Sequence, residues 1–284
     1  MTKLPSTLHL PLAACSKAPK TLTLLKKYLL HTVCQEANCP NRLFCFSQQR
    51  ATFLALGNFC TRACAFCLLG LAKAKNKLPA PDPEEPAKIA LCAHKLNLKH
   101  LVLTQVTRDD LEDGGAEHLA QIIRAVKKKL PQITSEVLSS DFQGCFSAAD
   151  KLLKEKITIF NHNLETTSRL TPYLRDPKAS YTRSLALLNY VKKQNLCQVK
   201  SGLMVGLGEK PGEIKKALED LKAAGCDLVT IGQYLPPSKK NYPLKEYVSL
   251  KQFQEYQNFG RKLGFKKILA FPLARSSLNA EELF

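Results

Sequence analysis

Residues 51–67 read ATFLALGNFCTRACAFC, a short apolar run followed closely by three cysteines. The run from Thr52 to Leu56 is mostly apolar and stops at a Gly-Asn pair, so it predicts a buried strand that ends in a turn. Cys60, Cys64 and Cys67 then occupy the loop that follows this strand. The fold must therefore carry three thiols directly after its first strand.

The same order of strand and helix is repeated along the rest of the chain. Apolar runs of strand length alternate with amphipathic segments, and Gly, Pro, Asn and Asp residues separate them. The predicted strands are Thr52–Leu56, His100–Val106, Ser135–Ser140, Ile157–Asn161, Gln198–Val205 and Leu228–Tyr234. The predicted helices are Glu84–Leu96, Ala116–Lys129, Ser147–Lys154, Tyr181–Lys193, Gly212–Ala224 and Leu250–Leu263. This series predicts a parallel sheet with helices packed against it.

Chemically active residues follow several of these strands, and their positions favour a barrel over an open sheet. A parallel barrel gathers every strand-to-helix loop at one mouth, whereas an open doubly wound sheet gathers only those at its switch point. The fold class we expect is α/β, an incomplete (β/α)6 TIM-type barrel whose open side admits a large substrate. We assign residues 51–265 to this barrel, residues 1–50 to a cysteine-bearing N-terminal extension and residues 266–284 to a short C-terminal tail.

Composition and hydropathy indicate one soluble domain. The chain has 284 residues, of which 45% are hydrophobic and 23% are charged, as is ordinary for a globular protein. No apolar run approaches the roughly 20 residues that a membrane-spanning helix needs, so no membrane partner is expected. The stretch Leu12 to Cys15 is similar to a lipoprotein cleavage site, but the prolines and the single lysine before it make a poor signal peptide. We therefore expect a cytoplasmic protein.

The formal net charge of +18 bears on the choice of partner. Such a charge favours an acidic protein, a nucleic acid or an anionic membrane surface over a cationic partner, although a solvated basic surface is an equal alternative. The lysines are scattered, for example at residues 73–77, 127–129 and 239–240, and form no long basic tail. Nucleic-acid binding is therefore not specifically indicated.

Cysteine is the informative residue type, since six of the eleven cysteines lie between Cys34 and Cys67. Closely spaced thiols in a cytosolic protein more often bind metal or do redox chemistry than form disulfides. Cys60, Cys64 and Cys67 form a C-x3-C-x2-C pattern, and three thiolates leave one iron of a [4Fe–4S] cube open to chelate a small molecule. A structural zinc site and buried reduced thiols are the alternatives.

A second cysteine group precedes the first. Cys34, Cys39 and Cys45 form a C-x4-C-x5-C pattern that ends fifteen residues before Cys60. With a fourth ligand from elsewhere, these thiols also suit a structural zinc ion. Their spacing is wider than that of a zinc pair and they accompany an iron–sulfur pattern, so a second [4Fe–4S] cluster is the preferred interpretation.

Together the two patterns carry a resemblance to a known family. The C-x3-C-x2-C loop with Phe66 before its last cysteine resembles the radical S-adenosylmethionine (SAM) superfamily, and the C-x4-C-x5-C group directly before it resembles the lipoyl synthases. The resemblance extends along nearly the whole chain, through TVCQEANCPN at 32–41, RDDLEDGG at 108–115, FNHNLET at 160–166, KSGLMVGLGE at 200–209, GQYL at 232–235 and RSS at 275–277.

The resemblance implies a reaction and two cofactors. It implies cleavage of SAM at the cluster of Cys60, Cys64 and Cys67, and radical-mediated insertion of two sulfur atoms at C6 and C8 of an octanoyl group. That group is carried on a lysine of a lipoyl carrier protein. The chemistry resides in the cofactors, so no side chain is expected to act as a catalytic acid or base.

The resemblance also implies ligands for the second [4Fe–4S] cluster. In this family, that cluster is the sacrificial sulfur source, and the thiols assigned to it here are Cys34, Cys39 and Cys45. A serine of the Arg-Ser-Ser motif is its fourth ligand. By position this serine is Ser277, with Ser276 as the alternative. An alkoxide matches iron less well than a thiolate does, which would leave one corner of the cluster labile.

Residues expected to contact SAM lie in four segments. Phe66 lies in the cysteine loop, and Asp113, Gly114 and Gly115 resemble the glycine-rich turn that receives the amino group of SAM. Asn163 and Glu165 follow the fourth strand, and Met204 lies in the segment that would approach the adenine. The alternatives are structural, namely a helix-starting turn before Ala116, hydrogen bonding within the loop and a tight turn at a strand end.

The resemblance further implies partners. These are octanoylated lipoyl carrier proteins, either lipoyl domains of 2-oxoacid dehydrogenase E2 subunits or the glycine cleavage H protein, and an electron donor such as flavodoxin or ferredoxin. Two rival functions remain open, a transfer RNA methylthiotransferase and a non-enzymatic zinc or iron–sulfur protein that binds nucleic acid. The chain departs from the family pattern at Leu278, usually tyrosine, and at Phe46, commonly tryptophan.

Overall fold

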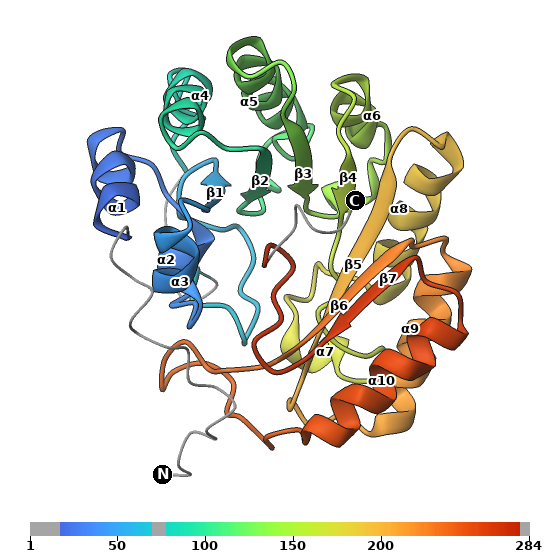
Figure 1. The fold of residues 1–284 in the computed structure, drawn as a ribbon. Helices are drawn as coiled ribbons and strands as arrows, with labels where there is room; N and C mark the ends of the chain where they lie inside the picture. The colour runs from blue at the N-terminus through green and yellow to red at the C-terminus, as the bar shows by residue number, and fades with distance from the viewer. Residues whose placement is uncertain (1–17, 70–77, 279–284) are drawn as a thin grey trace.

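The computed structural model describes residues 18–69 and 78–278 and contains one parallel sheet (Figure 1). The sheet order is β1-β2-β3-β4-β5-β6-β7, and each neighbouring pair is parallel. The strands are β1 Thr52–Ala55, β2 His100–Gln105, β3 Thr134–Leu138, β4 Ile159–Asn161, β5 Gln198–Val205, β6 Leu228–Gln233 and β7 Lys267–Ala270. Within the described residues β1 does not pair with β7, so the sheet forms a barrel that is not closed.

Helices follow the strands and cover the outside of the curved sheet (Figure 1). They are α4 Glu85–Lys95, α5 Ala116–Lys129, α6 Ser147–Lys154, α8 Tyr181–Gln194, α9 Pro211–Ala223 and α10 Leu250–Lys262. Shorter elements lie in the connections or before the barrel, namely α1 Ala18–Lys27, α2 Val33–Glu36, α3 Arg42–Ser47, the 3₁₀ turn Phe142–Gly144 and α7 Thr171–Leu174. This arrangement places every strand-to-helix loop at the carboxyl end of the sheet.

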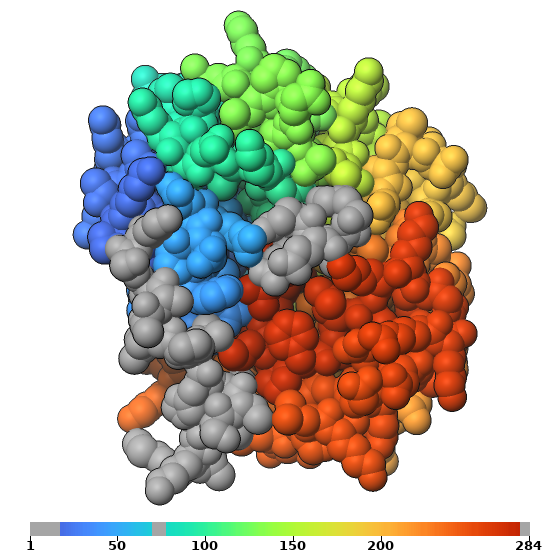
Figure 2. Space-filling view, in the orientation of Figure 1, coloured from blue at the N-terminus to red at the C-terminus, as the bar shows by residue number. Residues whose placement is uncertain are grey.

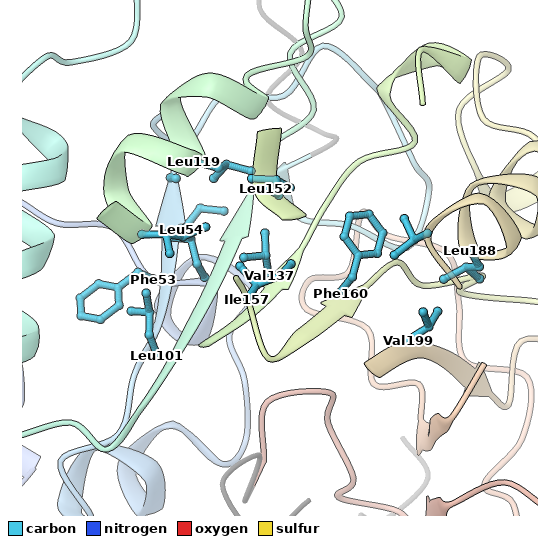
Figure 3. Close-up of a cluster of buried hydrophobic side chains, with 14 of the residues drawn as sticks. Phe53, Leu54, Leu101, Leu119, Val137, Leu152, Ile157, Phe160, Leu188 and Val199 are labelled. Atoms are coloured by element: carbon cyan, nitrogen blue, oxygen red, sulfur yellow. The ribbon is translucent and has the colours of Figure 1, made fainter. Parts of the chain in front are cut away.

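The core lies between the sheet and these helices. Figure 3 shows side chains from strands and helices packed together there, including Phe53, Leu119, Val137 and Leu188. Each of these four is fully buried. Burial of a Leu or Phe side chain stabilises a fold by about 1.5–3 kcal/mol, so this layer holds the helices against the barrel and makes the strand ends a rigid platform.

All six predicted strands and six predicted helices are present, with ends shifted by a few residues, and the partial-barrel prediction is confirmed. The expected number of strands was wrong, because β7 adds a seventh strand in the segment that we assigned to the tail. β7 has only four residues, KILA, and half of them are only partly buried, so the sequence pattern for a strand was weak. The domain boundaries stay a prediction.

The C-terminal segment returns to the N-terminal segment that carries the first cysteines. Asn41 Nδ2 donates a hydrogen bond of 2.8 Å to the carbonyl of Leu273. In the same N-terminal segment, Asn38 Nδ2 donates one of 3.2 Å to the carbonyl of Pro237, which lies in the connection between β6 and α10. In the space-filling view the red C-terminal residues lie beside the blue N-terminal ones (Figure 2). No helix within residues 18–69 and 78–278 has the length and hydrophobicity needed to span a bilayer.

Candidate functional site

The loop carrying Cys60, Cys64 and Cys67 follows β1 and is held by a buried arginine. Arg62 donates two hydrogen bonds of 2.9 Å to the carboxylate of Asp109 and one of 2.5 Å to Asp141. Burial alone would lower the pKa of Arg62, but the two carboxylates outweigh it and raise the pKa above its usual value. Because Asp109 and Asp141 follow β2 and β3, Arg62 ties the loop to both neighbouring strand ends.

Backbone contacts fix the same loop at further points. The amide of Ala63 donates to the carboxylate of Asp176 at 2.8 Å, and the amide of Thr61 donates to the carbonyl of Thr107 at 3.0 Å. The amide of Ala65 donates to the carbonyl of Leu174, the last residue of α7. The three cysteines therefore lie on a loop held by the connections after β2, β3 and β4.

The thiols of this loop influence one another electrostatically. Burial, with a smaller contribution from the nearby Cys67 and Cys60 thiols, raises the pKa of Cys64 to about 11, although the Asp176 amide and Arg175 act to lower it. Placing three thiols together in a partly desolvated loop disfavours three uncompensated negative charges. Such a group needs cationic charge, which a metal cluster supplies.

The second cysteine group lines a separate small cavity of about 40 Å³. Cys34 lies in α2, Cys39 follows α2 and Cys45 lies in α3, so two short helices bring the three thiols to one wall. The C-terminal segment supplies Arg275 and Ser277 to the same cavity. The structure thus brings together the three predicted cysteines and the predicted serine.

Charge is distributed unevenly around this small cavity. Burial raises the pKa of Cys34, and the neighbouring Cys39 thiol adds to that effect. Burial lowers the pKa of Arg275, which a hydrogen bond to Cys39 partly offsets. A guanidinium beside a thiol stabilises the thiolate form, the form that binds a metal.

Neither cysteine group has the arrangement of a site for a single metal ion. None of the described cysteines forms a disulfide. Within residues 18–69 and 78–278, no three His, Cys, Asp or Glu side chains converge tightly enough to hold one metal ion. Each cysteine around an iron–sulfur cube binds a different iron, so the sulfurs of such a site lie farther apart than ligands of one ion.

A larger cavity of about 280 Å³ lies beside both groups. Cys67 from the first group and Cys34 and Cys39 from the second line it. Much of its wall is apolar, with Val33, Leu68, Val102, Leu138, Leu203 and Leu235 among its residues. A long apolar group bound here would therefore lie close to both sets of thiols.

Most of the residues expected to contact SAM line this larger cavity, namely Phe66, Asn163, Glu165 and Met204. Glu165 has a positive φ of 69°, and burial raises its pKa, while Arg175 opposes that rise. A non-glycine residue in this backbone region is strained, and such strain is concentrated at functional sites. Ser276 and Ser277 line the cavity as well.

The turn at Asp113, Gly114 and Gly115 lies elsewhere and is absent from the residues that line these two cavities. The Asp113 carboxylate accepts hydrogen bonds from the amides of Gly115 and Glu117 and pairs with Lys151 at 2.8 Å. Gly115 adopts φ 87° directly before α5. These contacts bear out the helix-starting interpretation, and a contact between this turn and SAM stays a prediction.

The two departures from the family pattern occupy different environments. Phe46 is fully buried in the core under α1, and its carbonyl accepts a hydrogen bond from Thr21. Leu278 lines the small cavity with the three cysteines. Of the remaining cysteines, Cys92 and Cys226 are buried as expected, Cys197 is half-buried and Cys145 is exposed, whereas Cys15 lies outside the described residues.

Sequence reasoning missed three charged side chains near these cavities. Lys200 and Glu136 form a fully buried ion pair, and Glu136 lines the larger cavity. Arg175 lies close enough to Cys64 to lower its pKa, and its Nε is buried with no hydrogen-bond partner among the described residues. Lys200 is the first residue of the KSGLMVGLGE motif, so the sequence carried a signal for the ion pair. Arg175 lies outside every motif quoted above.

Comparison with known proteins first defines the class. Residues 54–233 match the family model of the Radical SAM superfamily, so this is a radical SAM protein. Its fold is similar to that of methylornithine synthase, with a TM-score of 0.57 at 16% identity over 89% of this chain and 74% of that one. A radical SAM protein uses a [4Fe–4S] cluster together with SAM.

Curated relatives then define the family. The chain is 48% identical to the lipoyl synthase of Caldicellulosiruptor saccharolyticus over 99% of this chain and 97% of the relative. It is 50% identical to the lipoyl synthase of Chlamydia felis over 98% of this chain and 88% of the relative. The chain therefore belongs to the lipoyl synthase family.

Proposed function

We propose that this chain inserts two sulfur atoms, at C6 and C8, into an octanoyl group carried on a lysine of a lipoyl carrier protein. The observation that carries the proposal is the shared cavity, since thiols of both cysteine groups line one apolar space. Breaking an unactivated C–H bond needs a radical, and the resulting carbon radical needs sulfur nearby. A cavity that joins the two groups meets both needs.

Cys60, Cys64 and Cys67 fit the ligand set of the radical-generating cluster. They are three thiols on one anchored loop, and no fourth cysteine follows in the loop up to Leu69. When bound, the reduced cluster supplies the electron that cleaves SAM to methionine and a 5′-deoxyadenosyl radical. The protein's part is to hold the loop at the strand ends and to keep water away from the radical.

Several side chains fit SAM itself. Arg175 has a buried Nε without a partner among the described residues, and it lies near Cys64. Its guanidinium suits the carboxylate of the methionine portion, because a buried donor without a partner is costly. Asn163, Glu165 and Met204 follow or end the neighbouring strands and would hold the ribose and the adenine, with Phe66 packing beside the cysteine loop.

Cys34, Cys39 and Cys45 fit a second [4Fe–4S] cluster with Ser277 at the fourth corner. The supporting observation is that all four side chains line one small cavity. Three cysteines and one serine make a donor set with one hard, weakly matched ligand. We propose that this cluster supplies the inserted sulfur and is consumed in doing so.

The partners follow from the substrate and the charge. An octanoylated carrier protein is the substrate class of this family, and we propose lipoyl domains of 2-oxoacid dehydrogenases or the glycine cleavage H protein as the carriers. The net charge of +18 favours acidic carriers, since complementary charge accelerates encounter. The electron donor would be a flavodoxin or a ferredoxin. Reduced cluster thiols favour a reducing compartment, so we propose a cytoplasmic location.

The decisive test is turnover of a defined substrate. The protein is reconstituted anaerobically with iron and sulfide and incubated with SAM, a reductant and an octanoyl-lysyl peptide. We expect about eight irons per chain, as two four-iron clusters require, together with 5′-deoxyadenosine and a peptide that gains two sulfur atoms by mass spectrometry. Deoxyadenosine without sulfur on the peptide would move the substrate elsewhere, and zinc without SAM cleavage would overturn the proposal.

A further inference from the structure

A buried ion pair crosses the interior of the barrel directly behind the C-terminal segment. Lys200 on β5 donates to both carboxylate oxygens of Glu136 on β3, at 3.0 and 2.9 Å. Asn161 at the end of β4 donates to the same carboxylate at 2.7 Å. All three side chains are at most 1% exposed, so a charged group is held in the barrel interior by partners from three adjacent strands.

Lys200 makes one further bond, and its acceptor lies in the C-terminal segment. Its Nζ donates a hydrogen bond of 2.5 Å to the backbone carbonyl of Ser276. That carbonyl belongs to the peptide bond that links Ser276 to Ser277. A contact at this atom therefore fixes the backbone immediately before Ser277, the residue that lines the cavity of Cys34, Cys39 and Cys45.

Other contacts of the segment act before this point, within the segment itself or on its side chains. The carbonyl of Leu273 accepts from Asn41, and the amide of Leu278 donates to the carbonyl of Arg275 at 3.0 Å. The Ser276 hydroxyl donates to Asn163 at 3.3 Å, a weaker contact than the one from Lys200. Of these interactions, the bond from Lys200 attaches the Ser276–Ser277 peptide to a strand of the barrel through a charged donor.

The cost of this arrangement indicates a function. Removing a lysine and a glutamate from water is expensive, and a buried pair of this kind is often no more stabilising than apolar residues of the same size. Glu136 accepts from two of the three donors of the Lys200 ammonium group, so the third donor needs another acceptor, and that acceptor is a backbone atom of the C-terminal segment. Lys200 holds its third bond for a backbone atom that an apolar side chain cannot bind.

We propose that the Lys200–Glu136 pair is a positioning device that orients Ser277 toward the iron–sulfur cluster held by Cys34, Cys39 and Cys45. The inference rests on the proposed function, because it assumes that this cluster exists. Glu136 and Asn161 fix the ammonium group, the ammonium fixes the Ser276 carbonyl, and the carbonyl fixes the direction in which the next residue points. Neither Lys200 nor Glu136 touches the cluster in this scheme.

The test uses a full-length parent variant in which Cys60, Cys64 and Cys67 are all alanine, so that only the second cluster is loaded. Iron loss to a chelator such as bipyridyl is followed by absorbance. In Lys200→Met we expect iron loss to be about tenfold faster or more, as loss of a hydrogen bond from a charged donor implies. Lys192→Met, which breaks the ion pair with Asp227 on the outside of the barrel, is the matched control and should leave the rate unchanged.

Two double variants separate positioning from simple stability. Lys200→Met with Glu136→Leu removes both charges and leaves no uncompensated carboxylate, so a role in folding alone predicts that iron retention returns to the parent level. Positioning predicts that it stays fast. In Lys200→Met with Ser277→Ala, iron loss should match that of Ser277→Ala alone, because the two changes remove the same ligand.

Each outcome decides between the proposals. If the parent retains about four irons and Lys200→Met loses them no faster, the positioning role is wrong while the proposed function stands. Restored retention in the Lys200→Met, Glu136→Leu variant, or additive effects with Ser277→Ala, would also overturn it. If the parent holds no iron after reconstitution, the second cluster is absent, and the proposed function and the positioning role fail together.

Discussion

Ser276 and Ser277 are adjacent in the chain, but of the two only Ser277 lines the small cavity. Ser277 lines both the small cavity of Cys34, Cys39 and Cys45 and the larger cavity beside it. Ser276 lines only the larger of these two cavities. The Ser276 hydroxyl is engaged with Asn163 and its carbonyl with Lys200. This difference favours Ser277 over Ser276 as the serine ligand proposed here.

Ser277→Ala should therefore abolish sulfur insertion while leaving the first cluster loaded. An alanine cannot supply oxygen to the fourth corner of the second cluster, so that cluster should lose iron faster to a chelator. Production of 5′-deoxyadenosine should continue, since Cys60, Cys64 and Cys67 are untouched. The measurement is iron content, deoxyadenosine and sulfur-bearing product in the same reaction. Ser276→Ala is the control, and an equal loss of iron in that variant would contradict the assignment.

Gly202 and Gly232 should tolerate no larger residue, because the C-terminal segment lies against both. A Cβ at Gly202 would lie 2.7 Å from Asn163 Oδ1 and 3.0 Å from the Ser276 hydroxyl, and one at Gly232 would meet the Ala274 carbonyl. Gly202→Ala and Gly232→Ala should cost about 1–3 kcal/mol by overpacking and should reduce sulfur insertion. Gly212→Ala is the matched control, since nothing lies within 4 Å of its Cβ position. Thermal unfolding and turnover of the three variants provide the comparison.

Arg62→Met should release the loop that carries Cys60, Cys64 and Cys67. The substitution removes a buried guanidinium that binds Asp109 and Asp141, and breaking a buried ion pair from one side typically costs about 3–5 kcal/mol. We expect loss of the cluster at Cys60, Cys64 and Cys67 and of deoxyadenosine formation, with iron retained at the second cysteine group. Iron analysis of the reconstituted variant measures this. Retention of about eight irons and full SAM cleavage would show that the anchor is dispensable.

Asp227→Asn should destabilise the fold in a pH-dependent way. Burial alone would raise the pKa of Asp227, but bonds from Lys192, the Val199 amide and Lys266 outweigh it and hold the pKa below its usual value. A lowered pKa in the folded state contributes stability above the unfolded value of about 3.9, and this contribution disappears as the pH falls through the folded value. The free energy of unfolding should therefore differ from wild type by about 1–3 kcal/mol near neutral pH.

The same difference should shrink steadily below about pH 4, where the carboxyl becomes protonated in the unfolded and then in the folded chain. Urea unfolding of both proteins between neutral pH and about pH 3 tests this. A difference that does not change with pH would mean that the Asp227 charge contributes nothing and that the variant acts through packing.

Turnover of an acidic carrier should depend on salt, whereas turnover of a short octanoyl-lysyl peptide should depend on it little. The net charge of +18 attracts an acidic protein over long range, and salt screens that attraction at a distance of about 8–10 Å near physiological ionic strength. We expect KM for the carrier to rise with salt while kcat changes less. Equal salt responses for the carrier and the peptide would remove charge steering from the mechanism.

Much of the fold could be predicted because it rests on local patterns. The strand before Cys60 is a short continuous apolar run, and the helix from Ala116 to Lys129 repeats apolar residues at the helical period; the structure contains both. The strand Lys267–Ala270 could not be recognised in this way, since four residues that begin with a lysine and follow another show little periodicity. Its formation depends on pairing with β6, a contact between residues far apart in the chain.

The sequence by itself determined the order of strands and helices, the spacing of the six clustered cysteines and the family, because these are properties of neighbouring residues. Only the tertiary structure decided that Cys39 and Cys67 line one cavity and that Ser277 lies with Cys34, Cys39 and Cys45. It also decided that Lys200 binds the carbonyl of the peptide before Ser277. Those relationships depend on how far the sheet curves and on where the C-terminal segment returns. The curvature of the sheet and the path of the C-terminal segment are set by the packing of the whole barrel. No local sequence pattern encodes that packing.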